Sequence, residues 1–320
     1  MGEVKIPPPF FPYISSKILH LVMIVTENCN FRCVYCYERF QPNIMDKDVS
    51  EGVINLIKVR APELWLLQIS WFGGEPMLYY RYIINFMKAI EEYKHDNLKI
   101  VGDISTNGYL LDLEKLKNLL KHHVKLFQIT LDGDKTYHDK VRVKADGGPT
   151  FEKIWNNIIT ASRTDLDFEF ILRIHVHRDN VDSVKNLLAM IASVIGSDRR
   201  FRIFIRPIGM FGGPNDHLIK TPDLATVGKL REYAKSLGLR VLEGKGVCYA
   251  SALNSFVVYP DGRVGKCTVA LYDEKNIVGR INRDGSLTLD GDKILWWARG
   301  ILRGDFETAS CPYAAPDARL

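Results

Sequence analysis

The chain has 320 residues, of which 46% are hydrophobic and 25% are charged, as in ordinary globular proteins. No stretch approaches the roughly 20 apolar residues that span a bilayer, and the N-terminus has no basic-then-apolar secretion signal. The 43 basic and 38 acidic residues give a net charge of only +5, which does not indicate a nucleic-acid partner. We expect a cytoplasmic protein with no membrane and no nucleic-acid partner.

Strand-like and helix-like patterns alternate between residues 18 and 238. For example, Leu113, Leu116 and Leu120 share one face of a helix that Asp112 would cap. Such alternation predicts an α/β fold with a parallel sheet, whose chemistry lies at the carboxyl ends of the strands. The predicted strands are Ile18–Thr26, Trp65–Phe72, Lys99–Ser105, Lys125–Leu131, Phe168–Val176 and Arg202–Pro207.

The pattern changes after a glycine cluster at residues 238–247. We therefore predict an N-terminal arm over residues 1–17, a parallel-sheet domain over 18–238 and a small domain over 239–320. The arm, which contains several prolines, should pack across the start of the sheet. The small domain should contain two hairpins and a helix, namely Ser255–Tyr259 with Val264–Thr268, Ile277–Ile281 with Ser286–Leu289, and Ile294–Leu302.

Six cysteines fall into two groups, three within eight residues and three in the last quarter of the chain. Without a secretion signal, this grouping indicates metal ligation rather than disulfides. Cys29, Cys33 and Cys36 follow the first predicted strand, where three thiolates can bind a cubane iron–sulfur cluster and leave its fourth iron free. A structural zinc site is the alternative, although zinc requires four ligands and no nearby histidine or cysteine supplies the fourth.

The segment from Cys29 to Cys36, Cys-Asn-Phe-Arg-Cys-Val-Tyr-Cys, resembles the signature of the radical S-adenosylmethionine (SAM) enzymes. Residues 71–76, Trp-Phe-Gly-Gly-Glu-Pro, are similar to the glycine-rich motif with which that family meets the amino group of SAM. Glycines allow a backbone to approach a ligand closely, and Glu75 can accept hydrogen bonds from an ammonium. The resemblance implies a [4Fe–4S] cluster on Cys29, Cys33 and Cys36, with SAM at the open iron.

Two further strand ends, at residues 105–108 and 130–133, resemble positions of the family that face the ribose and the rest of the cofactor. Residues 138–142, His-Asp-Lys-Val-Arg, resemble a segment typical of the peptide-modifying subgroup. Arg173 is a candidate for the SAM carboxylate, with a surface ion pair as the alternative. The SAM-binding residues that the resemblance implies are Tyr35, Gly73, Gly74, Glu75, Pro76, Ser105, Asn107, Thr130, Asp132 and Arg173.

The resemblance also implies a fold and a reaction. The expected fold is a partial barrel of six βα units. An external one-electron reductant, such as flavodoxin or ferredoxin, reduces the cluster, and electron transfer cleaves SAM to methionine and a 5′-deoxyadenosyl radical that abstracts a substrate hydrogen. The sequence does not identify a catalytic residue beyond the cluster ligands.

Cys248, Cys267 and Cys311 lie in segments that resemble the SPASM domain and the shorter Twitch domain, which carry auxiliary clusters. The implied role is ligation of one auxiliary [4Fe–4S] cluster, although Ala314 stands where the second cysteine of a closing CxxC pair would be. The cluster would then have a free or non-cysteine fourth site. The alternatives are a truncated chain with a degenerate site and purely structural buried thiols.

The leading hypothesis for function is a radical SAM peptide maturase that crosslinks or oxidises a ribosomally made peptide. Thr268 follows Cys267 where sulfatase-maturing members of the family have an aspartate proposed as the base. Formylglycine formation is therefore disfavoured, and the sequence offers no replacement base. The alternatives are a radical SAM dehydrogenase or epimerase of a sugar-like small molecule and, without radical chemistry, a zinc-stabilised binding protein.

Overall fold

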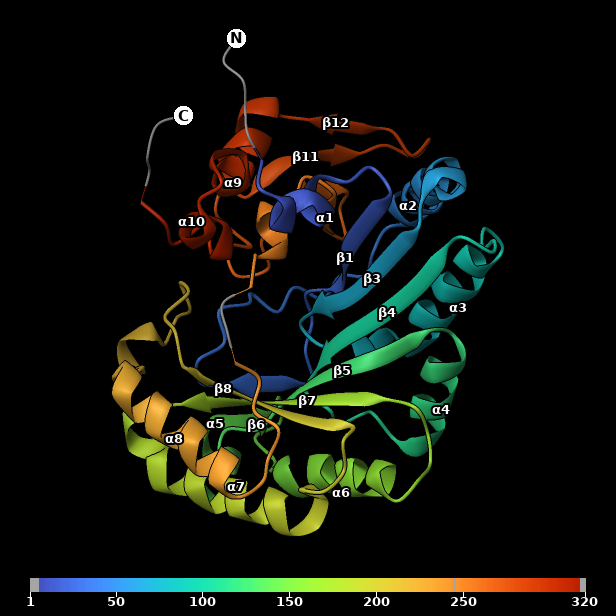
Figure 1. Cartoon of the computed structure of the whole chain (residues 1–320). Coiled ribbons are helices and arrows are strands. Elements are labelled where there is room, and N and C mark those ends of the chain that lie inside the picture. The colour runs from blue at the N-terminus through green and yellow to red at the C-terminus, as the bar shows by residue number, and fades with distance from the viewer. Residues whose placement is uncertain (1–5, 244–245, 317–320) are drawn as a thin grey trace.

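Six parallel strands form the larger part of the sheet and pair in the order in which they occur along the chain. The computed structural model describes residues 6–243 and 246–316. Each strand pairs in parallel with the next, as the predicted βα alternation requires, and Figure 1 shows them fanning from the first to the last. They are β1 (Ile18–Thr26), β3 (Leu66–Gly73), β4 (Lys99–Thr106), β5 (Val124–Thr130), β7 (Glu169–Val176) and β8 (Phe201–Pro207).

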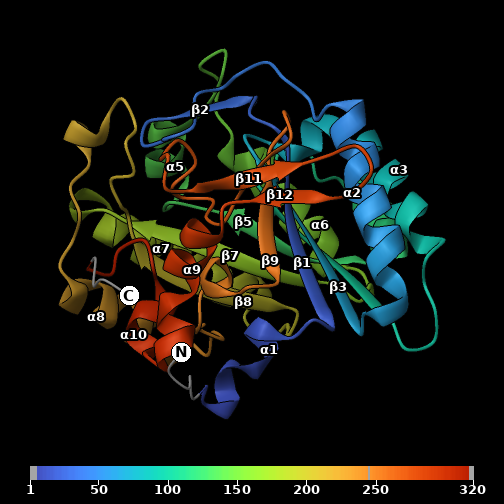
Figure 2. The ribbon, with the colours of Figure 1, turned by 90° about the horizontal axis from the view of Figure 1, so that it is seen from above.

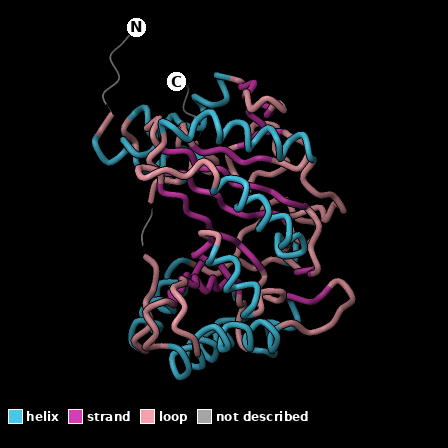
Figure 3. The backbone as a smooth tube through the Cα atoms, turned by 90° about the vertical axis from the view of Figure 1, so that its right-hand side faces the viewer, coloured by secondary structure: helices cyan, strands magenta, loops and turns pink. Residues whose placement is uncertain are grey.

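The helices that follow these strands cover the outer face of the sheet (Figures 1 and 3). Their apolar faces produce this arrangement; Phe86, for example, meets the fully buried Trp71 edge-on with ring centroids 5.4 Å apart. Asp112 accepts a hydrogen bond from the Lys115 N–H at 2.9 Å and caps its helix as predicted. The helices are α2 (Lys47–Arg60), α3 (Tyr80–Glu91), α4 (Leu113–Lys121), α6 (Phe151–Ser162), α7 (Val181–Ile195) and α8 (Leu224–Ser236).

Short elements gather at the carboxyl ends of the strands. β2 (Phe31–Cys33) pairs antiparallel with β6 (Arg142–Lys144), and α5 (Lys135–Val141) leads into β6. A 3-10 turn, Pro76–Tyr79, follows β3. The cysteine loop and the segment 138–142 therefore meet at the end of the barrel where parallel α/β folds place their sites.

The C-terminal strands extend the same sheet rather than forming a separate one (Figure 2). β9 (Ser255–Val258) pairs in parallel with β1, and the remaining strands follow antiparallel. The sheet thus continues across the predicted boundary at 238–247, of which residues 244–245 lie outside the described residues. These last strands are β10 (Arg263–Gly265), β11 (Ile277–Ile281) and β12 (Leu287–Leu289).

Two helices and the N-terminal arm complete the C-terminal domain. α9 (Gly291–Arg303) and α10 (Phe306–Ser310) pack together, and the arm forms a 3-10 turn and α1 (Phe11–Ile14). Phe10 is buried against Ile301 and Ala309. In the described part of the arm, Phe10 thus packs on the C-terminal helices, which offer it an apolar surface. The carbonyl oxygens of Tyr13 and Lys17 accept from the N–H groups of Leu253 and Trp65, so the arm also crosses the start of the sheet, as predicted. Among the described residues, no helix has the length and apolar character needed to cross a membrane.

Candidate active site

Cys29, Cys33 and Cys36 lie on the loop that leaves β1 and passes through β2. Cys33 stands opposite Arg142 in the β2–β6 ladder. The Phe31 N–H points at Cys29 Sγ at 3.3 Å. A hydrogen bond to sulfur of this kind would stabilise a cluster-bound thiolate.

Burial is the main influence on these thiols. It raises the pKa of Cys29 and Cys33, and it raises the pKa of Cys36 to about 12 with a further contribution from Glu38. Cys33 lies in electrostatic range of both other cysteines, so the three are neighbours. Within the described ranges no three His, Cys, Asp or Glu side chains converge closely enough for a single metal ion. A cubane does not require such convergence because each thiolate binds a different iron, and the loop fits a [4Fe–4S] cluster.

Gly73 and Gly74 make room for the cysteine loop. A Cβ at Gly73, which has a φ of +126°, would lie 2.1 Å from the Thr26 carbonyl oxygen. At Gly74 a Cβ would lie 2.2 Å from the Asn28 carbonyl oxygen. In the structure, these glycines allow the backbone that leaves β1 for the cysteine loop to pass close to the end of β3.

Glu75 is fully buried and accepts hydrogen bonds from three sides. The donors are Thr106 Oγ1 at 2.6 Å, the Asn107 N–H at 2.7 Å and the Met77 N–H at 2.9 Å. Asn107 Nδ2 in turn donates to Asn30 Oδ1 at 2.8 Å, which ties the end of β4 to the cysteine loop. Glu75 and Asn107, both predicted to meet SAM, thus also shape the loop; Pro76 is buried at the start of the next turn.

Tyr35 and Asp132, also predicted to meet SAM, are joined to each other in a buried network. The Tyr35 hydroxyl donates to Asp132 and accepts from Arg142 Nη1 at 2.6 Å. His175 Nδ1 lies 3.2 Å from Asp132 Oδ1. Burial alone would favour the neutral acid, but His175 and Arg142 lower the pKa of Asp132 well below its usual range. An ionised Asp132 therefore holds β5, β6, β7 and the cysteine loop in one arrangement.

Arg173 is a largely buried cation whose Nε has no hydrogen-bond partner in the described part of the chain. Burial and the neighbouring Arg206 lower its pKa, while Tyr37 and Tyr35 lie in electrostatic range. The structure therefore directs Arg173 toward the cysteine loop, where a carboxylate would satisfy it. Ser105 and Thr130 are half-buried near the same strand ends. The arrangement fits the carboxylate of SAM.

The structure also brings the three C-terminal cysteines together. The Cys248 N–H donates to the Ala309 carbonyl oxygen at 2.9 Å, next to the segment that carries Cys311. The Val269 N–H points at Cys267 Sγ at 3.4 Å. Burial raises the pKa of Cys248 to about 11, and both other thiols add to the effect, which makes all three neighbours.

Sequence reasoning missed Arg299, which positions the Cys311 segment. Arg299 is 1% exposed, and its Nη2 donates to the carbonyl oxygens of Pro312 at 2.8 Å and Ala315 at 3.2 Å. The available signal was an arginine inside the apolar run Trp-Trp-Ala-Arg-Gly-Ile-Leu. A charge in such a run is buried only if it has partners.

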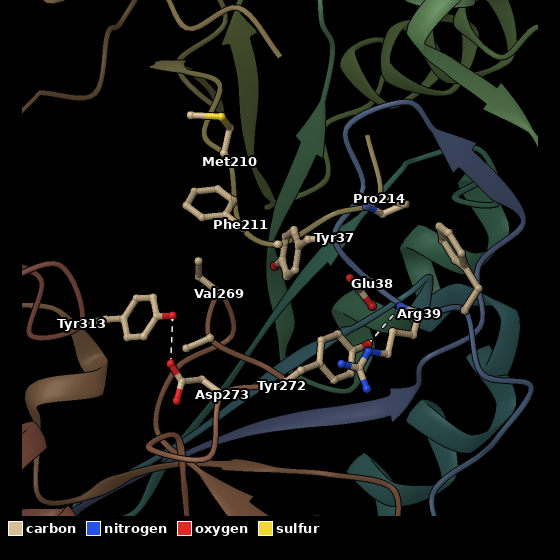
Figure 4. Close-up of a pocket in the computed structure, with 13 residues that line it drawn as sticks. Tyr37, Glu38, Arg39, Met210, Phe211, Pro214, Val269, Tyr272, Asp273 and Tyr313 are labelled. Carbon is tan, nitrogen blue, oxygen red and sulfur yellow. Dashed lines mark hydrogen bonds between the residues drawn. The ribbon is translucent and has the colours of Figure 1, made fainter. Parts of the chain in front are cut away.

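A cavity of about 750 Å³ adjoins the cysteine loop (Figure 4). Sequence reasoning also missed Glu38, which lines this cavity two residues after Cys36 and is only 9% exposed. Burial, then the carboxylates of Glu27 and Glu75, raises the pKa of Glu38 to about 8. The walls come from the loop after Cys36, from the loop after β8 and from the C-terminal domain, with Tyr37, Glu38, Arg39, Phe40, Met210, Phe211, Gly212, Pro214, Val269, Ala270, Tyr272, Asp273 and Tyr313 as lining residues.

Similar proteins were found among curated sequences. A cysteine-type anaerobic sulfatase-maturating enzyme of Clostridium novyi (strain NT) is 30% identical over 161 residues, 47% of this chain and 42% of the relative. A GTP 3′,8-cyclase of Campylobacter jejuni (strain RM1221) is 36% identical over 120 residues, 37% of this chain and 36% of the relative. The matches therefore span less than half of these relatives.

Solved structures share the fold. The chain resembles anSMEcpe with bound AdoMet and the Kp18Cys peptide at a TM-score of 0.68 and 19% identity, over 90% of this chain and 83% of the other. It resembles Streptococcus suis SuiB bound to S-adenosylmethionine at a TM-score of 0.62 and 18% identity, over 91% of this chain and 68% of the SuiB chain. The model of the radical SAM superfamily matches residues 23–191, which include the cysteine loop and the strand ends described above. This match covers more than half of the chain, which therefore belongs to the radical SAM superfamily, whose members use a [4Fe–4S] cluster and SAM.

Proposed function

We propose that the chain is a radical SAM enzyme that modifies a side chain of a ribosomally made peptide by crosslinking or oxidation. One observation carries the proposal: the cysteine loop lies beside a cavity that the C-terminal domain bounds on its other side. A substrate in this cavity would lie between the first cysteine group and the second. This is the arrangement that hydrogen abstraction followed by electron removal needs.

The residues of the chain bind and position the reactants. When bound, the [4Fe–4S] cluster supplies the electron that cleaves SAM and generates the radical that abstracts the substrate hydrogen. Cys29, Cys33 and Cys36 would hold that cluster. The charge of Arg142 favours the thiolate form of Cys33 and would offset part of the negative charge of the bound cluster. Arg173 would receive the SAM carboxylate.

We propose that Cys248, Cys267 and Cys311 hold one auxiliary [4Fe–4S] cluster. Their mutual proximity and the Val269 N–H directed at Cys267 Sγ support this assignment. Ala314 cannot supply a fourth thiolate, so one iron would remain for another ligand. Such a cluster would accept the electron that a net oxidation or crosslink releases.

The peptide substrate is supported by two names among the similar proteins. One relative is a sulfatase-maturating enzyme, and one solved neighbour is SuiB bound to its precursor peptide SuiA. A small-molecule substrate is the second candidate, because the GTP 3′,8-cyclases match at 36% identity. The zinc-stabilised binding protein finds no support in the family assignment.

Metal analysis of anaerobically reconstituted protein tests the cluster assignments. Two cubanes predict about 8 irons per chain, and Cys311→Ala should lower the value toward about 4. Ser310→Ala, at the neighbouring position, is the matched control and should leave iron unchanged. Stoichiometric zinc without iron would contradict the enzyme assignment, and unchanged iron in Cys311→Ala would contradict the auxiliary site.

The reaction is tested with dithionite or flavodoxin as the reductant. We expect the reconstituted protein to convert SAM to 5′-deoxyadenosine and methionine, and Cys33→Ala to abolish this. Precursor peptides encoded beside the gene, and sugar-like alcohols, are then compared by mass spectrometry. Loss of hydrogen from a peptide supports the proposal, whereas turnover of an alcohol alone supports the second candidate.

A further inference from the structure

The cavity beside the cysteine loop has mainly aromatic walls. Tyr37 and Phe211 meet edge-on with ring centroids 5.7 Å apart, and Tyr313 stacks on a tryptophan of α9 at the opposite side. The Arg39 guanidinium already lies over the Tyr272 ring, 4.0 Å from its centroid. One ring face at the wall thus already holds a cation, and the other aromatic side chains supply apolar surface.

Among the described residues, two acidic side chains and one arginine line the cavity, and Arg32 lies over the ring of the lining Phe40, 4.2 Å from its centroid. Glu38 and Asp273 line the cavity, and Glu27 lies behind Tyr272, whose hydroxyl donates to Glu27 Oε1 at 3.2 Å. Of the cavity's lining residues in the described ranges, Arg39 is the single Lys or Arg. Glu38 and Asp273 thus offer acceptor oxygens to a group that enters the cavity.

Glu38 is the member of this set that needs a partner. Its carboxyl is about nine-tenths buried, and its Oε2 has no hydrogen-bond partner in the described part of the chain. Glu27, by contrast, accepts from Asn43 Nδ2 at 2.7 Å, and Asp273 accepts from the Tyr313 hydroxyl at 3.1 Å. A buried carboxyl without a donor costs free energy that a bound cation with N–H groups would recover.

We propose that this cavity binds the cationic side chain of a lysine or arginine in the substrate peptide, with the Glu38 carboxyl group as the hydrogen-bond acceptor that receives it. The inference rests on the proposed function, since it names the kind of residue that the peptide brings to the site. The aromatic walls enclose the methylene stem, and Asp273 adds attraction from the side of the C-terminal domain. Glu38 is then a specificity-determining residue.

Binding of matched peptides tests this assignment on the full, cluster-reconstituted chain with SAM present. The probes are acetylated and amidated pentapeptides, Gly-Gly-Xaa-Gly-Gly, in which Xaa is lysine, arginine or norleucine. Dissociation constants are measured by anaerobic calorimetry. We expect a cationic peptide to bind at least about tenfold more tightly than the norleucine peptide, because a charge-assisted hydrogen bond forms in a buried site.

Three variants identify the receiving group. Glu38→Gln should remove the preference for the cationic peptides, Asp273→Asn should weaken it about threefold, and Glu114→Gln, an exposed control on α4, should leave it unchanged. Equal binding of all three peptides to the unmodified chain would overturn the proposal, as would absence of binding by any of them. It would also fall if Glu38→Gln weakened SAM binding as strongly as peptide binding, because Glu38 would then serve SAM. Reductive SAM cleavage without peptide reports separately on the proposed radical chemistry.

Discussion

Asp132 is a buried carboxylate that faces two basic side chains of the site, His175 and Arg142. Its Oδ1 lies 3.2 Å from His175, and Arg142 lies 3.8 Å from its Oδ2. Asp132→Asn removes the carboxylate partner of the buried Arg142, so we expect a loss of about 3 kcal/mol in the free energy of unfolding. Urea unfolding of the anaerobic, reconstituted protein measures this loss.

Asp167→Asn is the control for Asp132→Asn. Asp167 pairs with Lys125 at the surface, where its side chain is 87% exposed. An exposed pair contributes little, and we expect a change below about 0.5 kcal/mol. Similar changes in the two variants would mean that the buried network does not stabilise the fold.

His20 makes stability depend on pH inside the barrel. Its ring lies between Ser70 Oγ at 2.8 Å and Ser255 Oγ at 3.0 Å, and burial, then Lys266, lowers its pKa to about 4. Between pH 6.5 and 4, His20 of the unfolded chain binds a proton that His20 of the folded chain does not. The free energy of unfolding is therefore highest above pH 6.5 and falls as the pH drops below that value. From pH 7 to 5, His20 alone should account for a loss of about 2 kcal/mol.

Urea midpoints at pH 7 and pH 5 test this expectation by comparing the unmodified chain with His20→Gln. The variant should lose less stability on acidification, by about 2 kcal/mol. His138 and His175 are also buried with a pKa of about 4, so part of the pH dependence should persist. The same pH dependence in both proteins would rule out a contribution from His20.

At the scale of elements, local pattern predicted much of the fold. β1 and β11 begin and end at the predicted residues, and the other five barrel strands differ by one residue at one or both ends. β10 stops at Gly265 instead of continuing to Thr268, because the N–H groups of Lys266 and Cys267 donate to Asn276 Oδ1 rather than to a neighbouring strand. The end of β10 therefore depends on a side chain ten positions away from Lys266, which a local sequence pattern cannot reveal.

Other features depend on contacts between distant segments. The hairpin pattern of β9 predicts its antiparallel partner but not its parallel pairing with β1. The motifs at Tyr35 and Asp132 indicated a cofactor site through their resemblance to those of the family, whereas the hydrogen bond between the two side chains depends on the folded barrel. Likewise, only the folded structure shows that Glu38 Oε2 has no hydrogen-bond partner among the described residues.

The contact between the end of β3 and the cysteine loop should not tolerate a side chain at Gly74. A Cβ there would lie 2.2 Å from a backbone oxygen of that loop, and backbone cannot move aside cheaply. We expect Gly74→Ala to cost more than about 2 kcal/mol and to lower bound iron from about 8 toward about 4 per chain.

Gly228→Ala is the matched control for Gly74→Ala. Gly228 lies inside α8, and apart from the backbone of that helix no described atom lies within 4 Å of a Cβ added there. Alanine should stabilise this helix by about 0.5–1 kcal/mol and leave iron unchanged. Equal iron in the two variants would show that the loop accommodates a side chain at Gly74.

For the whole molecule, the ten-stranded sheet makes the barrel and the C-terminal strands one unit. β9 adds directly to β1, and the β11–β12 hairpin reaches α2, where Arg283 lies 2.9 Å from Glu51 and its carbonyl oxygen accepts from Asn55 Nδ2 at 2.8 Å. The Tyr37 hydroxyl donates to the Thr268 carbonyl oxygen at 2.8 Å, which joins the cysteine loop to the segment after Cys267. The two cysteine groups are thus held at a fixed separation by the same sheet that supports the cavity.

We therefore expect the barrel and the C-terminal strands to unfold together. In hydrogen exchange of the reconstituted protein under increasing urea, the amides of the paired residues Val22 and Val257 should open with free energies that agree within about 1 kcal/mol. The exposed edge strand β12 should exchange more easily through local fraying, and it serves as the internal comparison. If Val257 opened at least about 2 kcal/mol more easily than Val22, the C-terminal strands would be a separate unit, and the fixed distance between the two cysteine groups would be lost.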